Sequence, residues 1–147
     1  MLIRDILNLK PGTIHGIDGS RRLTDAVDLM VEHDIGSLVV TESGVMAGML
    51  TFREVLRALA KTGGSLADIR SREVMVQDPV CGSPGDTLDE LRTLMTRHHI
   101  RYLPVKDGNQ LVGIISFHDV AKAVIKETSM ENRLLKRYIE SSPVEPT

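Results

Sequence analysis

An internal repeat constrains this sequence more than any other feature. Displaced by 65 residues and without a gap, residues 23–60 match residues 88–125 at 11 of 38 positions. The identical pairs include His33 with His98, Gly48 with Gly113, and Phe52 with Phe117. Units of about 60 residues are each near the lower size limit for an independent core, so we expect the two repeats to pack on each other.

The repeat divides the chain into five predicted segments. Two glycines and alternating charges at 61–72 are typical of a linker with one short helical turn. We therefore predict a first repeat at 1–62, a linker at 63–72, a second repeat at 73–127, a C-terminal helix at 128–140 and a disordered tail at 141–147.

Each repeat has the predicted order strand, helix, strand, strand, helix. Apolar residues at i, i+3, i+4 and i+7 predict amphipathic helices that begin at Leu23 and Leu88. Short aliphatic and β-branched runs around Ser43-Gly44 and Asp107-Gly108 predict hairpins. The predicted strands are 13–17, 37–41, 46–50, 79–82, 102–106 and 111–115, and the predicted second helices are 52–60 and 117–126. Helices must cover strands that are apolar on both faces, so the expected fold class is α/β (α+β).

The segment after the repeats has its own helical pattern. Thr128 and Glu131 have the spacing of a capping box, which predicts a new helix start. An apolar stripe follows at Met130, Leu134, Leu135, Tyr138 and Ile139. We expect this helix to dock on its own domain, with contact to a second subunit as the alternative.

Composition excludes several classes of protein. A formal net charge of −2, 3% aromatic residues and no Trp argue against a nucleic-acid partner, which needs a basic excess and stacking rings. No apolar run is long enough to cross a membrane or to act as a secretory signal, and Cys81 has no second cysteine to pair with. We therefore expect a cytoplasmic protein that needs no metal or disulfide to fold.

Catalytic motifs are not found in the sequence. The five histidines and Cys81 show no metal-binding spacing, and the sequence contains no GxSxG, no Walker lysine loop and no GxGxxG. We expect Cys81 to be a small buried side chain beside a strand, and we expect the chain not to be an enzyme.

The motif richest in chemistry occurs once in each repeat, where a strand meets a helix. GMLTFRE at 48–54 corresponds to GIISFHD at 113–119. Thr51 with Glu54, and Ser116 with Asp119, have capping-box spacing, which needs no ligand. A helix N-terminus is also a phosphate site, and a carboxylate one turn later can accept hydrogen bonds from ribose hydroxyls. The repetition of the motif favours a ligand.

At these motifs the chain resembles the cystathionine-β-synthase (CBS) domain family. The resemblance covers residues 1 to 126 and includes the segments IGSLVV at 35–40 and IRYLPV at 100–105. It implies two β-α-β-β-α repeats packed sheet to sheet about a pseudo-twofold axis, with two clefts that bind adenosine-containing ligands. It also implies a homodimer that senses a nucleotide and regulates a separate protein.

The resemblance assigns residues to each cleft. In the first, Asp119 would bind the ribose, Ser116 and His118 would face the phosphate, and Arg101 would pair with it. Ile114 would lie against the adenine, while the first repeat contributes backbone around Ile35, Gly36, His15 and Ile17. The second cleft would use Met49, Thr51, Arg53 and Glu54, facing Val80 and Ile100.

The second cleft departs from the family pattern, because Glu54 replaces the usual Asp. Its extra methylene shifts the carboxylate outward, so we expect the cleft at Asp119 to bind more tightly. The basic residues nearby have a simpler alternative role: Arg97 and His98 suit the negative end of a helix, whereas Arg101 continues into the strand on the expected ligand side.

The expected function is therefore a regulatory module that binds AMP, ADP, ATP or NAD and signals to an unidentified protein partner. A dimerisation or scaffold module that binds no nucleotide is the alternative, favoured by Glu54 and by the C-terminal helix.

Overall fold

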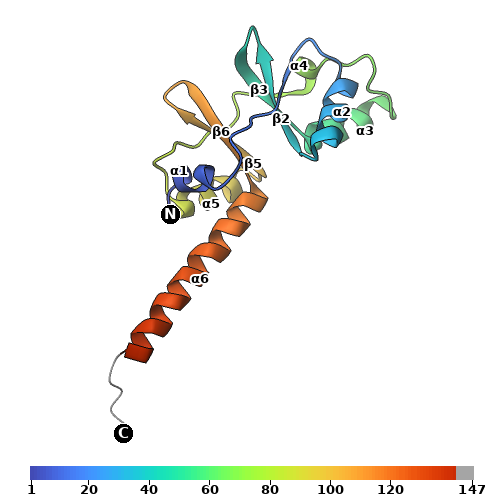
Figure 1. Cartoon of the computed structure of the whole chain (residues 1–147). Helices are drawn as coiled ribbons and strands as arrows, with labels where there is room; N and C mark the ends of the chain where they lie inside the picture. Colours follow the sequence, from blue (N-terminus) through green and yellow to red (C-terminus); the bar gives the residue numbers. More distant parts are fainter. Residues whose placement is uncertain (142–147) are drawn as a thin grey trace.

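The computed structural model describes residues 1–141, excluding the side chain of Ser141. The elements in chain order are α1 (Ile3–Asn8), β1 (Gly16–Asp18), α2 (Leu23–His33), β2 (Ser37–Glu42), β3 (Val45–Thr51), α3 (Phe52–Thr62), α4 (Ser71–Val74), β4 (Val76–Gln77), α5 (Leu88–Arg97), β5 (Tyr102–Asp107), β6 (Gln110–Ser116) and α6 (Phe117–Ser141) (Figure 1). The two repeats and their helix–hairpin–helix order are confirmed. Residues 142–147 of the predicted tail lie outside the described residues.

The two sheets differ in size. The larger sheet has the strand order β1-β2-β3-β4, with β1 parallel to β2 and the other pairs antiparallel. Its first three strands belong to the first repeat, whereas β4 lies within the predicted second repeat at 73–127. In the second repeat β5 and β6 form an antiparallel hairpin. The predicted strand at 79–82 is wrong as a strand, because within the described chain it makes one isolated parallel bridge, from Gly82 to Val105.

A proline explains why the second sheet has no counterpart of β1. In the first repeat the backbone N–H of Val39 donates to the carbonyl of His15 at 3.0 Å. The equivalent of Val39 in the second repeat is Pro104, which has no N–H to donate to the equivalent of His15, Val80. The second repeat therefore lacks a hydrogen bond that extends the first sheet.

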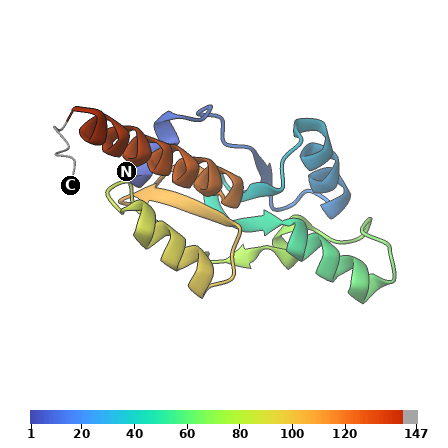
Figure 2. The same cartoon turned by 90° about the horizontal axis from the view of Figure 1, so that it is seen from below.

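Each repeat has its own hydrophobic core, and the chain crosses between the two. The first core contains Leu23, Leu38 and Leu50, and Ile69 from the connecting segment packs against it. The second contains Leu91 and Leu103 together with two residues of α1, Ile3 and Ile6. Helix α1, which no sequence pattern predicted, therefore packs on the second core, although the sequence boundaries place it in the first repeat. Figure 2 shows the N-terminus on the same side as α5 and α6.

Helix α6 contradicts two sequence predictions. It runs without interruption from Phe117 to Ser141, so no separate helix begins at Thr128. Its sequence contains no Gly or Pro to stop it, and a Thr inside a helix cannot act as its N-cap. The expectation that residues 128–140 dock on their own domain is also wrong, because all of them are exposed and α6 projects past the repeat (Figure 1).

Candidate functional site

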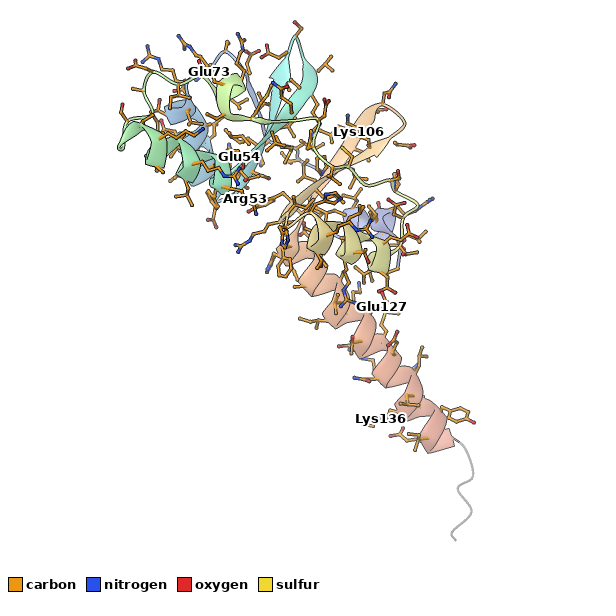
Figure 3. The ribbon with its side chains drawn as sticks, turned by 180° about the vertical axis from the view of Figure 1, so that it is seen from behind. Arg53, Glu54, Glu73, Lys106, Glu127 and Lys136 are labelled. Atoms are coloured by element: carbon orange, nitrogen blue, oxygen red, sulfur yellow. The ribbon has the colours of Figure 1, made fainter. Side chains whose placement is uncertain are left out.

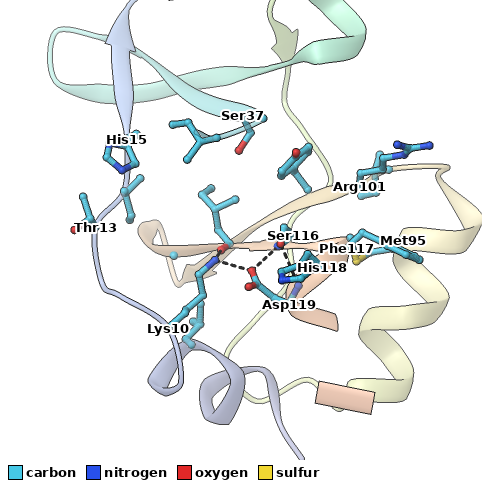
Figure 4. A pocket seen from close by; sticks show the side chains of 18 of the residues that line it. Lys10, Thr13, His15, Ser37, Met95, Arg101, Ser116, Phe117, His118 and Asp119 are labelled. Carbon is cyan, nitrogen blue, oxygen red and sulfur yellow. Dashed lines mark hydrogen bonds and ion pairs between the residues drawn. The ribbon is translucent and has the colours of Figure 1, made fainter. Parts of the chain in front are cut away.

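A pocket of about 1030 Å³ lies between the two repeats. This volume is at the upper end of the range for small-ligand sites. Its walls come from the segment 7–15, the turns that lead into β2 and β5, strand β6 and the start of α6. Figure 4 shows His15 and Ser37 on one side of the pocket, with Lys10, Ser116 and Asp119 on the other. Both repeats are therefore needed to form the site.

Asp119 lies at the N-terminus of α6, where it completes a reciprocal cap. The backbone N–H of Ser116 donates to Oδ2 of Asp119 at 2.8 Å, and the N–H of Asp119 donates to Oγ of Ser116 at 3.1 Å. This is the capping arrangement that the motif predicted. It turns the carboxylate toward the pocket, with 17% of the side chain still exposed.

Lys10 is the second partner of this carboxylate. Its Nζ donates to Oδ2 of Asp119 at 2.6 Å and to the carbonyl oxygen of Ile114, also at 2.6 Å (Figure 4). Burial by itself would raise the pKa of Asp119. The hydrogen bonds from Lys10 and Ser116, with the charge of Lys10, outweigh it and hold the pKa below the ordinary value of 3.8. Asp119 is therefore an anion at neutral pH.

Further basic groups line the same pocket. Arg101 and His118 line it from the second repeat, and Arg53 from the first. The Nη2 atom of Arg53 donates to the carbonyl oxygen of His99 at 2.6 Å, which links α3 to the turn before β5. The pocket therefore pairs one anchored carboxylate with several cationic side chains, a combination that suits a ligand with both hydroxyl and anionic groups.

The structure brings together ten of the fifteen residues predicted for the two clefts. These line the pocket: His15, Ile35, Gly36, Arg53, Ile100, Arg101, Ile114, Ser116, His118 and Asp119. The other five are not among its lining residues: Ile17, Met49, Thr51, Glu54 and Val80. Arg53 and Ile100, which the sequence assigned to the second cleft, thus lie on the pocket that contains Asp119.

Glu54 has a different environment from Asp119. Its Oε1 accepts from both the N–H and the hydroxyl of Thr51, each at 2.9 Å, and only 6% of the residue is exposed. Its carboxylate thus serves as a buried helix cap.

The strand before Glu54 is also covered. Strand β4 pairs with β3 at Gly48 and Met49, and Met75 packs against Gly48. At the equivalent place in the second repeat, Lys10 binds the carbonyl oxygen of Ile114. The two repeats therefore differ at the positions where the two clefts were predicted.

Sequence reasoning missed several lining residues. Lys10 and Thr13 belong to an irregular segment with no periodic signal, and their place in the pocket follows from the path of the chain between the repeats. Tyr102 packs against Gly36 and is half-buried, and its burial raises the pKa of its phenol although Arg101 nearby lowers it. The only available signal for Tyr102 was its position beside Arg101.

Two further properties concern residues 1–141. They contain no group of three or more His, Cys, Asp or Glu residues arranged to hold a metal ion. No helix among them has both the length and the apolar character that crossing a membrane requires.

Comparison with known proteins gives a consistent result. The sequence profile of the CBS domain matches twice, at residues 14–61 and 71–126. The CBS domain-containing protein YhcV of Bacillus subtilis is 35% identical over 120 residues, which cover 81% of this chain and 82% of that protein.

Solved structures of similar proteins agree. A CBS-domain protein from Burkholderia ambifaria has a TM-score of 0.82 at 35% identity, with 86% of this chain and 95% of that chain covered. A CBS-domain containing protein from Agrobacterium tumefaciens has a TM-score of 0.80 at 30% identity, with 84% of this chain and 98% of that chain covered.

Proposed function

The chain belongs to the CBS-domain family, and from this premise we propose that it is a regulatory module whose pocket binds an adenosine-containing nucleotide. CBS domains are regulatory modules that often bind adenosine ligands. The observation that carries the proposal is the anchored carboxylate of Asp119 at the wall of a nucleotide-sized pocket. AMP, ADP, ATP and NAD share the adenosine that such a site recognises.

The ribose is assigned to Asp119. Its two hydrogen bonds from Lys10 and Ser116 both end on Oδ2, so Oδ1 is the atom that accepts from the vicinal hydroxyls. Ile114 and Ile35, from opposite repeats, provide apolar surface for the adenine, and the backbone near Gly36 and His15 borders it. The ligand thus contacts both repeats at once.

The phosphate is assigned to the basic side of the pocket. Ser116 and His118 lie at the N-terminus of α6, where the positive end of the helix favours an anion. Arg101 and Arg53 add full positive charges. The number of cations suits a small anionic ligand.

The regulatory step follows from the position of the ligand. A nucleotide that contacts both repeats favours the relative orientation in which those contacts are made. We propose that this change is transmitted to a separate protein partner by a homodimer in the cytoplasm.

The test is a thermal-shift and calorimetric titration with AMP, ADP, ATP and NAD. Ligand at 100 times its Kd should add about 2.7 kcal/mol to the stability, a shift of several degrees. We expect a stoichiometry of one nucleotide per chain, since Glu54 is buried in its cap. Asp119→Asn should weaken binding at least tenfold, whereas Asp107→Asn, at the end of β5 and outside the pocket lining, should not.

One observation favours a second candidate function. The exposed apolar surface of α6 suits a dimerisation or scaffold module that needs no nucleotide. If none of the four nucleotides changes the melting temperature at millimolar concentration, the scaffold function replaces the regulatory one.

A further inference from the structure

Lys10 gives one half of the repeat a charge that the other half lacks. At the repeat displacement of 65 residues its counterpart is Met75, which packs against Gly48. Lys10 lines the pocket between the repeats, and 29% of its side chain is exposed. An ammonium group that is largely removed from water needs acceptors for its protons.

Two of the three N–H groups of Lys10 have acceptors in the protein. Its Nζ donates to Oδ2 of Asp119 and to the carbonyl oxygen of Ile114, each at 2.6 Å. A lysine ammonium carries three N–H groups and no lone pair. Residues 1–141 provide no third acceptor for Nζ, so one N–H is left for water or a ligand in the pocket.

Asp119 presents the complementary atom. Its Oδ2 accepts from Lys10 at 2.6 Å and from the backbone N–H of Ser116 at 2.8 Å. Within the part of the chain that the structure describes, Oδ1 accepts from no group. An ionised carboxylate only accepts hydrogen bonds. Lys10 and Asp119 together therefore offer a ligand one donor and one acceptor.

The free N–H of Lys10 and Oδ1 of Asp119 are close enough to share one ligand atom. Nζ lies 2.6 Å from Oδ2, and two C–O bonds of about 1.2 Å connect Oδ2 to Oδ1, so Nζ and Oδ1 are at most about 5 Å apart. An N–H···O bond and an O–H···O bond to one oxygen together span about 5.6 Å. A hydroxyl group, which both donates and accepts, fits between the two.

Lys10 approaches Asp119 from the side away from the other basic groups. Figure 4 shows Lys10 on one side of Asp119, with His118 and Arg101 on the other. The phosphate is assigned to the side of His118 and Arg101. The group that lies between Lys10 and Asp119 is therefore the ribose.

We propose that Lys10 is a specificity residue of the nucleotide pocket, which donates a hydrogen bond to a ribose hydroxyl whose proton Asp119 accepts. The pair thereby selects ribonucleotides over their deoxy analogues. This assignment rests on the proposed function, because it requires a nucleotide with its ribose at Asp119.

The test compares AMP and ATP with their 2′-deoxy and 3′-deoxy analogues in calorimetric titrations of the full chain. The measured quantity is the ratio of the Kd of each analogue to the Kd of its parent. In wild type this ratio should be at least ten for the analogue that lacks the contacted hydroxyl, because a hydrogen bond to a charged group is lost. Lys10→Met, which gives this position the side chain of its counterpart Met75, should reduce the ratio at least threefold.

Lys106→Met is the matched control. Lys106 is also half-buried, but it does not line the pocket. Figure 3 shows it on the β5–β6 hairpin, apart from Arg53, which does line the pocket. Lys106→Met should therefore leave the ratio unchanged. A structural loosening of the pocket would weaken the parent and the analogue alike, so the ratio separates such an effect from a lost contact.

The outcomes distinguish this assignment from the proposed function. A wild-type ratio near one, or a ratio in Lys10→Met that equals or exceeds the wild-type ratio, would overturn the role of Lys10 and leave nucleotide binding intact. A wild type that binds neither AMP nor ATP would also overturn it. The proposed function fails as well only if ADP and NAD do not bind either.

Discussion

The ammonium group of Lys10 donates a hydrogen bond of 2.6 Å to Oδ2 of Asp119, across 109 residues of the chain. A second bond joins the same group to the carbonyl oxygen of Ile114. Lys10 follows α1, which packs on the second core, and precedes β1, which belongs to the first sheet. This one side chain therefore fixes the crossing segment to the start of α6 at the wall of the pocket.

Loss of this contact should destabilise the protein in a pH-dependent way. Both side chains are less than one-third exposed, at 29% for Lys10 and 17% for Asp119, so Lys10→Met should cost about 1–2 kcal/mol at pH 7. Because the folded-state pKa of Asp119 lies below 3.8, this contribution is fully present above the unfolded-state pKa. It is lost as the pH falls through the lower folded-state value.

The measurement is urea unfolding of Lys10→Met, Asp119→Asn and the double variant between pH 7 and pH 3. The coupling between the two sites should be constant at the neutral end of this range and decrease towards the acidic end. Lys61→Met, on the exposed end of α3, is the matched control and should show no such coupling. A coupling that grows as the pH falls would contradict this assignment.

The repeat made much of the fold predictable. Helical spacing predicted the starts of α2 and α5 at Leu23 and Leu88, and both are confirmed. Local turns predicted the two hairpins, which the structure also contains. These features depend on residues near one another in the chain, and their signal is therefore present in the sequence.

Features that depend on distant residues were missed. Nothing near Lys10 indicates that it meets Asp119, since the contact requires α1 to pack on the second core. The effect of Pro104 on strand pairing can be predicted only when it is known that Pro104 lies beside the segment 79–82. For α6, the capping spacing at Thr128 was misleading, because the same residues also occur inside continuous helices.

Glu54 and Asp119 should respond differently to the same substitution. Glu54→Ala removes the buried cap of α3 and should cost about 1–2 kcal/mol of stability. The nucleotide affinity of the Glu54→Ala variant should stay within twofold of wild type, because Glu54 does not line the pocket. Asp119→Ala should lose cap stability and nucleotide affinity together, as measured by urea unfolding and calorimetry. An equal loss of affinity in both variants would show that Glu54 also binds ligand.

Gly36 has no room for a side chain at the junction of the repeats. A Cβ at this position would lie 2.8 Å from Cε2 of Phe52 and 2.9 Å from Cζ of Tyr102, with the Tyr102 hydroxyl in direct conflict. Gly36→Ala should therefore cost about 1–3 kcal/mol through overpacking. Gly12→Ala is the control, because its Cβ would have nothing within 4 Å.

The conflict at Gly36 can be tested by a second substitution. Tyr102→Phe removes the hydroxyl, so it should recover part of the stability that Gly36→Ala loses. Urea unfolding of the two single variants and the double variant gives the coupling directly. Additive effects would mean that Tyr102 moves aside without cost.

Cys81 should be a slow nucleophile with an unusual pH dependence. It was expected to be buried, but the structure places it half-buried between Val80 and Gly82. Partial burial raises the pKa of its thiol above 9.0, and the charge of Lys106 opposes this shift. Because the thiolate is the reactive form, alkylation by iodoacetamide at pH 8 should be several-fold slower than that of cysteine in a short unfolded peptide with blocked ends. The rate should still be rising above pH 9, where the reference thiol approaches its plateau.

Lys106→Ala should slow the reaction at pH 8 further by raising the pKa of Cys81, whereas Lys122→Ala on α6 should not. A rate in Lys106→Ala that exceeds the wild-type rate would mean that access to Cys81, rather than its pKa, limits the reaction.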